Sequence, residues 1–373
     1  MAYEVRFLER VREVPEATWN ALVAPDASPF VEWTWLDCLE EAGCVTASAG
    51  WLPVHLAIHK AGKLVAALPA YAKSNSEGEF VFDWSWADLA SRLGLAYYPK
   101  LVAAVPFTPA TGDRLLVLPG EDRRGLVDVA VQAVKRWLVA TGASGAHVLF
   151  PKEDEAHAWR EAGFLLRHGF QYHWHNEGYR TFDDFLLALP SKKRTQIRRE
   201  RAQPEKDGLR LATLGPDDFD DHAVDRMYAF YTDTVDKYFY GRRYLNRRFF
   251  DLVTERFRHR MPWVVATRDR EIVAGAFNVE KGDRLYGRYW GTSVDLPFLH
   301  FNVCYYHGVA YAISKGLRVF EPGAGGEHKH ARGFRPTLTY SAHWIEHPRM
   351  RGILAEFLAR ESDAVRAHVL EGS

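Results

Sequence analysis

Two stretches of the chain share one pattern, in which short apolar runs surround a polar turn. The first covers residues 54–68 with a turn at Gly62-Lys63, and the second covers residues 263–276 with a turn at Asp269-Arg270. Paired apolar runs of this length, separated by turn-forming residues, predict β-hairpins.

Each pattern is followed by more strand-like sequence and then by a helical stretch that ends before a glycine. The stretches are residues 126–140, before Gly142, and residues 301–314, before Gly316. A glycine just beyond the last helical residue is typical of a helix C-cap. The repetition predicts two related α/β lobes, with mixed sheets flanked by helices and a seam near residues 165–180. Two unrelated hairpins are the alternative.

We therefore expect an N-terminal lobe over residues 1–170, a C-terminal lobe over residues 171–350 and an amphipathic C-terminal helix over residues 351–373. A charged helical segment opens the second lobe. Thr181 and Asp184 have the spacing of a capping box, which predicts a helix over residues 182–189. Pro190 interrupts this helix, and Ser191 is placed to cap another.

Composition excludes several classes of protein. Among 373 residues, 48 basic and 48 acidic side chains cancel, so a site for a polyanion must be a local patch. Three cysteines provide no disulfide framework and favour a reducing compartment. The N-terminus lacks an apolar signal core, and no apolar run approaches the roughly 18 residues of a membrane helix. These features predict a soluble, cytoplasmic protein without a membrane span.

The segment Phe320–Phe334 has the densest candidate chemistry. It follows a strand-like run and combines glycines with two carboxylates, two histidines and two bases in fifteen positions. Glycine lets a backbone turn sharply and approach a ligand, and titratable groups at the end of a strand suit catalysis or anion binding. A structural glycine turn is the alternative.

Basic residues dominate the segment Ser191–Arg201, which holds six bases and one acid. Arg194, Arg198 and Arg201 fall on one helical face together with Ile197. Three guanidinium groups on one face can bind phosphate, because each offers a planar fork of donors. A solvated helix face is the alternative.

A third candidate is the strand-like segment 283–291. Strand alternation predicts that Tyr286, Arg288 and Trp290 share one face and line a cleft, since a charged arginine is costly in a dry core. The alternative is a strand that faces solvent.

The helix that begins near Leu299 places two histidines, a thiol and a tyrosine along one face. The spacings typical of zinc sites are missing, so we expect no metal and interpret the histidines as packed at a lobe interface. The four residues are His300, Cys304, His307 and Tyr311. Nucleophile-elbow, P-loop and dinucleotide-binding motifs are absent as well.

At these residues the sequence resembles the FemAB-like N-acyltransferases, a bacterial family labelled as peptidoglycan biosynthesis or recognition proteins. The likeness covers most of the chain. The strings that carry it are Ser28-Pro29-Phe30, residues 78–84, residues 97–101, Pro106–Pro109, residues 193–201, residues 285–291, residues 299–301, Cys304-Tyr305-Tyr306, residues 326–329 and Arg332-Gly333. Asn302 and Gly325 depart from the family pattern, which has Glu and Gln there.

The resemblance implies tandem GNAT folds, the architecture of acyl-CoA N-acyltransferases. It implies transfer of an acyl or aminoacyl group to the amine of a small molecule or peptide, with acyl-CoA or aminoacyl-tRNA as co-substrate and no tightly bound cofactor. Fem-type enzymes that use tRNA often carry a coiled-coil arm, and its absence here favours acyl-CoA. A non-catalytic binding module built on degenerate GNAT lobes is the opposing hypothesis.

Site residues follow from these motifs and from GNAT-type chemistry, in which a base deprotonates an ammonium group and an acid protonates the leaving group. We expect the C-terminal lobe to be catalytic. The expected catalytic residues are Glu327, His328, Glu321 and Tyr289, with Tyr340 as the alternative acid. The residues expected to bind the carrier are Lys193, Arg194, Arg198, Arg201, Gly323, Gly325 and Gly326. The residues expected to bind the acceptor are Tyr286, Arg288, Trp290, His300, Lys329 and Arg332.

Overall fold

The computed structural model describes residues 3–237 and 241–372, and the chain forms two compact units. The first unit contains the residues up to Phe170 and those from Leu338 onward, and the second is Gln171–Thr337. The division after Phe170 falls inside the predicted seam. The C-terminal boundary differs from the predicted lobe of residues 171–350, because Ser341–Ile345 pair with Leu149–Gly145 in the first unit.

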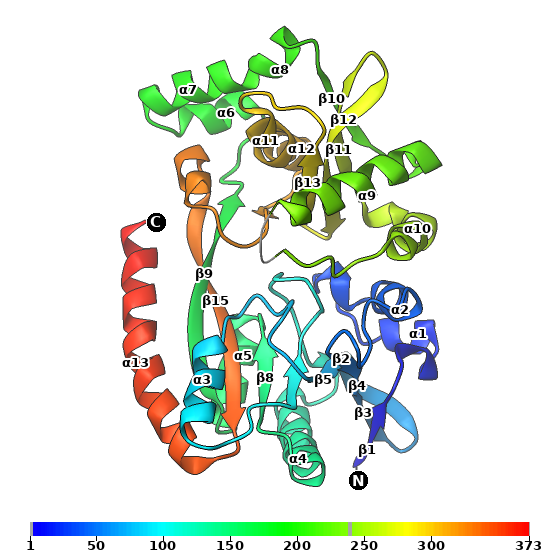
Figure 1. The fold of residues 1–373 in the computed structure, drawn as a ribbon, viewed down its shortest axis with the longest axis vertical. Coiled ribbons are helices and arrows are strands. Elements are labelled where there is room, and N and C mark those ends of the chain that lie inside the picture. The colour runs from blue at the N-terminus through cyan, green and yellow to red at the C-terminus, as the bar shows by residue number, and fades with distance from the viewer. Residues whose placement is uncertain (1–2, 238–240, 373) are drawn as a thin grey trace. The chain divides into compact units, whose positions relative to one another are not determined.

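The first unit contains a four-stranded sheet, ordered β1-β3-β4-β7, and the strands β15-β8-β6-β5-β2. Its helix α13 packs on α3 through Met350 and Leu354, so the expected C-terminal helix belongs to this unit (Figure 1). The elements are β1 (Tyr3–Leu8), α1 (Glu16–Asn20), α2 (Trp33–Glu41), β2 (Trp51–Pro53), β3 (His55–Lys60), β4 (Lys63–Leu68), β5 (Ala70–Lys73), α3 (Trp84–Arg92), β6 (Lys100–Ala103), β7 (Leu116–Val117), α4 (Arg123–Thr141), β8 (Gly145–Leu149), α5 (Glu153–Glu161) and α13 (Pro348–Glu371). The long strands β9 (Leu165–His175) and β15 (Arg335–Ile345) have residues in both units.

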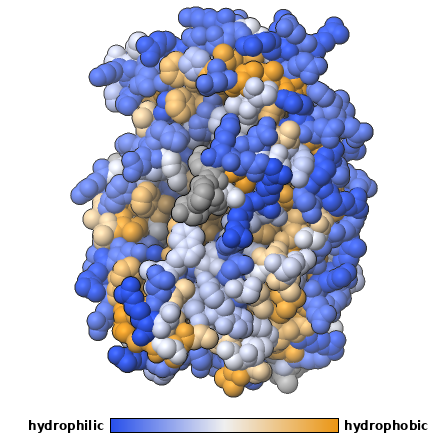
Figure 2. All heavy atoms as spheres, in the orientation of Figure 1, coloured by the Kyte–Doolittle hydropathy of each residue, from blue (hydrophilic) through white to orange (hydrophobic). Residues whose placement is uncertain are grey.

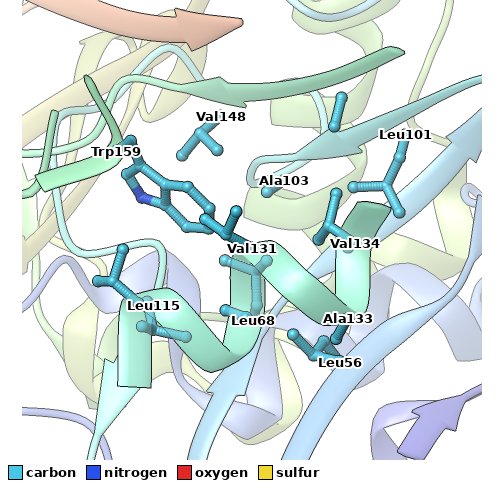
Figure 3. Close-up of a cluster of buried hydrophobic side chains, with 14 of the residues drawn as sticks. Leu56, Leu68, Leu101, Ala103, Leu115, Val131, Ala133, Val134, Val148 and Trp159 are labelled. Carbon is cyan, nitrogen blue, oxygen red and sulfur yellow. The ribbon is translucent and has the colours of Figure 1, made fainter. Parts of the chain in front are cut away.

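Apolar side chains from α4 fill the core of the first unit. Val131 and Val134 on α4 face residues of β3, β4, β6 and β8, and Trp159 of α5 closes one side (Figure 3). Helix α4 ends as predicted, since Gly142 has φ +68° and its N–H caps Leu138.

The second unit is a sheet in the order β10-β11-β12-β13-β14-β9, in which only β13 and β14 are parallel. Its elements are α6 (Phe182–Leu187), α7 (Ser191–Arg201), α8 (Gln203–Lys206), β10 (Arg210–Leu214), α9 (Asp221–Asp236), α10 (Arg247–Arg256), β11 (Trp263–Arg268), β12 (Glu271–Lys281), β13 (Arg284–Thr292), α11 (Leu299–Phe301), α12 (His307–Ser314) and β14 (Val319–Glu321).

Both predicted hairpins are present, as β3–β4 and β11–β12. Each turns through two residues in the left-handed region, Ala61-Gly62 and Asp269-Arg270. Turns of this hand match the twist of the flanking strands. The first turn lies one residue before its predicted position.

The capping box before α6 is confirmed, because Thr181 and Asp184 exchange side-chain and backbone hydrogen bonds. Ser191 does not cap α7: Pro190 occupies that position, and Ser191 is the first helical residue. The predicted helix of residues 301–314 begins at Leu299 and contains a π-helical turn over Asn302–Tyr306. Such turns occur often at functional sites.

Hydrophilic side chains cover most of the face shown in Figure 2, and hydrophobic ones form smaller patches. Within the described part of the chain, no helix has both the length and the apolar character needed to cross a bilayer.

Candidate active site

The candidate loop after β14 is a short 3-10 helix between two left-handed glycines. The helix covers Glu327–Arg332, and Gly326 and Gly333 flank it with φ +87° and +83°. These two turns bring the helix back onto α7 and the π-helical turn, so its side chains contact residues of both.

A tyrosine hydroxyl joins two histidines at this helix. The hydroxyl oxygen of Tyr305 lies 3.0 Å from Nε2 of His328 and 3.5 Å from Nε2 of His300. His300 stacks on Trp290 with ring centroids 4.3 Å apart. His328 is on the exposed side of the group, which makes it the member that a ligand can reach.

Both imidazoles are neutral at physiological pH. Burial, together with the charges of Lys329 and Arg332, lowers the pKa of His300 to about 4. Partial burial and the same two cations lower the pKa of His328. Burial raises the pKa of Tyr305, so its hydroxyl stays protonated. Neutral imidazoles can accept a proton, as a general base must.

Arg332 clamps the 3-10 helix onto α7. One terminal guanidinium nitrogen lies 3.1 and 3.2 Å from the two carboxylate oxygens of Glu200, and the other donates to the carbonyl oxygen of His328 at 2.9 Å. The guanidinium also covers the ring of Phe301, 3.3 Å from its centroid. Sequence assigned Arg332 to the acceptor, but both terminal nitrogens bond within the protein, and Nε is buried without a hydrogen-bond partner among the described residues.

Glu200 is the centre of this polar network and was missed as a site residue. It also accepts a short hydrogen bond from the Tyr306 hydroxyl, and its backbone oxygen accepts from Asn302 Nδ2 at 2.9 Å. The family strings contained Glu200 and both tyrosines, Tyr305 and Tyr306, without indicating which of them contact the loop. The departure at Asn302 thus concerns packing against α7.

Lys329 holds the glycine-rich segment that precedes the 3-10 helix. Its Nζ donates to the carbonyl oxygen of Gly323 at 2.7 Å. Burial lowers the pKa of Lys329 to about 8. Lys329 therefore fixes the loop that sequence reasoning expected to bind a carrier through Gly323, Gly325 and Gly326.

The other two candidate bases occupy different surroundings. Glu321 is buried at the end of β14, with Arg284 Nη1 at 2.9 Å and His173 Nε2 at 3.9 Å. Burial and nearby cations lower the pKa of His173 to about 3, so His173 is neutral, and the carboxylate forms its ion pair with Arg284. Glu327 is exposed and makes no side-chain hydrogen bond or ion pair with any residue that the structure describes.

The expectation that Tyr286, Arg288 and Trp290 share a face is wrong. The register between β12 and β13 shifts, since Phe277 pairs with Tyr289 but Asn278 pairs with Gly287, which leaves Arg288 as a bulge residue. One extra residue reverses the alternation beyond it. Trp290 therefore faces His300, and Tyr286 lies on the opposite face.

The same bulge separates Tyr289 from the two histidines. Its ring contacts Tyr231 and Phe277 at centroid distances of 4.9 and 5.9 Å, on the side of α9 and α10. Tyr340 lies in the first unit, 5.3 Å from the ring of His168. The hydroxyl that contacts His328 belongs to Tyr305. Tyr305 therefore replaces Tyr289 and Tyr340 as the candidate acid.

The arginine face of α7 packs against α6 around the buried Ile197. Arg194 donates to the carbonyl oxygen of Leu189 at 3.3 Å, and the guanidinium of Arg201 lies 3.7 Å from the ring centroid of Phe182. Arg198 pairs with Asp183 at 3.3 Å while its side chain stays 58% exposed. The face is therefore a packing surface whose guanidinium groups remain partly open to solvent.

The polar side chains along the helix after Leu299 have separate partners within the second unit. His307 Nε2 lies 2.8 Å from the Thr213 hydroxyl, and Tyr311 donates to Glu280 at 2.8 Å. Cys304 is partly buried, and burial raises the pKa of its thiol.

We expect Gly333→Ala to lower the free energy of unfolding by more than about 2 kcal/mol. A Cβ there would lie 2.7 Å from two ring carbons of Phe185, on a backbone with φ +83°. Gly325→Ala is the matched control, since φ is +69° but no heavy atom lies within 4 Å of its Cβ. Urea denaturation should show a loss of only about 1 kcal/mol for the control. Equal losses of unfolding free energy in the two variants would mean that the Phe185 ring moves to make room for the new methyl group.

We expect Asn302→Asp to cost about 2–4 kcal/mol of folding free energy, because a buried carboxylate would replace an amide that donates to the carbonyl oxygens of Glu200 and Phe298. Asn246→Asp is the control. Asn246 caps α10 by accepting from Phe249, and aspartate caps equally well. Chemical denaturation of both variants tests this, and a change below 1 kcal/mol at Asn302 would contradict it.

The two units, with mixed sheets flanked by helices, define an α/β protein of the class seen in FemX. The match to the FemX structure covers 95% of this chain and 100% of the FemX chain, with a TM-score of 0.56 at 9% identity. The C-terminal domain of a putative lysylphosphatidylglycerol synthetase from Agrobacterium fabrum covers 92% and 95%, with a TM-score of 0.55 at 13% identity. L-PGS from Bacillus licheniformis covers 86% and 95%, with a TM-score of 0.52 at 10% identity. At these identities the likeness concerns the fold alone.

The chain belongs to the FemAB-like family, described as peptidoglycan biosynthesis/recognition, whose model matches residues 10–372. The resemblance drawn from sequence is therefore confirmed, as is the α/β fold class with two units of mixed sheet flanked by helices. No curated protein matches the chain significantly. The family description connects the chain with peptidoglycan biosynthesis or recognition.

Proposed function

We propose that this protein transfers an acyl or aminoacyl group from an activated carrier to the amine of a peptide or cell-wall precursor. The observation that carries the proposal is the pair of neutral imidazoles, His328 of the 3-10 helix and His300 of α11, joined by the Tyr305 hydroxyl of the π-helical turn. Direct transfer to an amine needs a base for the ammonium group and an acid for the leaving group, and this arrangement offers both.

The exposed His328 accepts a proton from the acceptor ammonium group, directly or through Tyr305. The free amine attacks the carbonyl carbon of the thioester or ester, and a new C–N bond forms. The tetrahedral intermediate collapses as the bond to the carrier breaks, and the carrier's sulfur or oxygen takes up a proton from the imidazolium–tyrosine group. The new amide nitrogen then loses its second proton to the regenerated imidazole, which passes it to solvent.

The carrier is the second part of the proposal. Acyl-CoA needs no tRNA-binding arm, which favours acyl-CoA as the carrier. The lysyl group in the name of the structural neighbour from Agrobacterium fabrum favours an aminoacyl group instead. A phosphate-bearing carrier would lie along α7, where Lys193 and the partly exposed Arg198 provide positive charge.

A thermal-shift screen tests the proposal. The probes are acetyl-CoA, longer acyl-CoAs, aminoacyl-tRNA and nucleotide-linked muropeptides, because ligands of the folded state raise the melting temperature. The carrier and acceptor that bind are then incubated together with a label on the acyl group. Labelled acceptor is the expected product. Binding of both without any product would identify a non-catalytic recognition module.

We expect Arg194→Ala combined with Arg198→Ala to weaken carrier binding at least about fivefold at low salt, with a smaller effect at high salt. Arg124→Ala is the control, since Arg124 lies in an exposed ion pair with Glu161. Fluorescence titration at two salt concentrations measures the effect. Unchanged affinity at low salt would leave the face of α7 with a packing role only.

A further inference from the structure

A buried cluster of charged side chains lies in the first unit, which lacks the histidine loop. Glu79 and Asp83 place one carboxylate oxygen each on Nζ of Lys100, at 2.9 Å for Glu79 and closer for Asp83. All three are at least nine-tenths buried. Burying such charges costs several kcal/mol per ion, so packing alone is a poor account of the cluster.

When both carboxylates are ionised, their two negative charges exceed the one positive charge in direct contact. Lys73 is the other buried lysine, but its Nζ donates to Asn75 Oδ1 and to the carbonyl oxygen of Glu77, and it covers the Trp51 ring at 3.9 Å. Over residues 3–237 and 241–372, Lys100 is the sole cation within 4.0 Å of Glu79 or Asp83. Two carboxylates thus share one ammonium group.

Each carboxylate also has an oxygen without a partner. Glu79 Oε1 and Asp83 Oδ1 are buried and accept no hydrogen bond from any described residue. An unsatisfied carboxylate oxygen in a buried site is costly, and only a hydrogen-bond donor can satisfy it. Both groups meet at Lys100, and a cation with several N–H donors has one for each of the two oxygens.

The walls suit a cation and are held firmly. Lys100 Nζ lies 5.2 Å from the ring centroid of Tyr97 and 5.8 Å from that of Tyr98, and aromatic faces attract ammonium groups. Phe80 and Phe107 have φ +60° and +58°, a strained conformation for bulky residues that persists only in an over-determined site. Tyr98 is partly exposed and bonds Ser76, which bonds Lys100, so it marks the route to the surface.

We propose that the Glu79–Asp83–Lys100 cluster is a binding site for a primary ammonium group, which donates to Glu79 Oε1 and Asp83 Oδ1 beside the Lys100 ammonium. The site is separate from the histidine loop and does not depend on the proposed transfer reaction.

Binding should release a proton from Glu79. Burial and the Asp83 charge raise the pKa of Glu79 to about 7, although Lys100 and Lys73 oppose the shift. At pH 6 roughly a tenth of Glu79 is ionised and at pH 8 about nine-tenths, so affinity should rise about tenfold between them. The charged or titratable groups around the site are Lys73, Glu77, Asp83, Tyr97, Tyr98, Lys100 and His147.

Thermal unfolding of the full chain tests the site at constant ionic strength. The probe is methylammonium chloride, and the comparisons are tetramethylammonium, sodium and potassium chlorides. Methylammonium should raise the melting temperature saturably, with half-saturation about tenfold lower at pH 8 than at pH 6. Tetramethylammonium has no N–H donor and should not do so. An equal rise with it, with sodium or with potassium, or no saturable rise with methylammonium, would overturn the proposal.

Glu79→Gln removes the charge and nearly preserves the shape. It should lower methylammonium affinity at least about tenfold and abolish the pH dependence, whereas Glu121→Gln, in a surface pair with Lys60, should change neither. Retained affinity in folded Glu79→Gln would also overturn the proposal. If circular dichroism shows that this variant does not fold, the four-cation series on the wild-type protein decides alone.

Discussion

We expect His328→Ala to lower kcat by about two orders of magnitude or more while leaving the fold intact. His328 is the exposed member of the histidine pair, so its removal takes the base from the acceptor without opening a core cavity. The transfer assay built on the ligand screen measures the effect. His330→Ala is the matched control, because His330 is exposed on the same 3-10 helix and its nearest ring, that of Tyr172, is 6.2 Å away.

The pH profile separates catalysis from a structural role. A base must be unprotonated, so kcat/KM should fall as the pH drops through the pKa of His328. Since burial and two cations lower that pKa from 6.5, the fall should come at more acidic pH than for an ordinary imidazole. Tyr305→Phe keeps the ring but removes the hydroxyl, and it should reduce kcat with little change in stability. Full activity in both His328→Ala and Tyr305→Phe would exclude this group from the chemistry.

The second large effect concerns stability. We expect Glu200→Ala to lower the free energy of unfolding by about 3–5 kcal/mol, because it leaves the Arg332 guanidinium buried without its carboxylate. It also removes the acceptor of the Tyr306 hydroxyl. Urea denaturation followed by circular dichroism gives the value.

Asp183→Ala is the control for Glu200→Ala. Asp183 also pairs with an arginine, Arg198, but their side chains are 76% and 58% exposed. Exposed pairs contribute at most about 1 kcal/mol. Similar losses in the two variants would show that the Glu200 network does not hold the 3-10 helix.

Much of the architecture followed from local sequence signals. The two hairpins, the capping box at Thr181 and the helix end at Gly142 each depend on residues close together in the chain, and all four are present. The segment 320–334 was also identified from its composition. Its left-handed glycines fix the course of the loop, as glycine allows.

These local signals could not predict contacts between residues that are far apart in the sequence. One bulge residue at Arg288 moved Trp290 to the His300 side and Tyr289 away from it, and strand alternation alone cannot reveal an insertion that depends on the partner strand. Glu200 looked like the single acid of a basic helix, yet it accepts from Arg332, 132 positions later.

The sequence alone determined the family, the α/β class and the loop that carries the titratable groups, because these depend on local periodicity, turn residues and recognisable strings. Only the tertiary structure decided which groups meet. It placed Tyr305 between two histidines, used Lys329 and Arg332 to hold the loop, and buried Glu79 and Asp83 against a single lysine. The physical reason is that pKa values and hydrogen bonds are set by neighbours in space, which packing chooses from the whole chain.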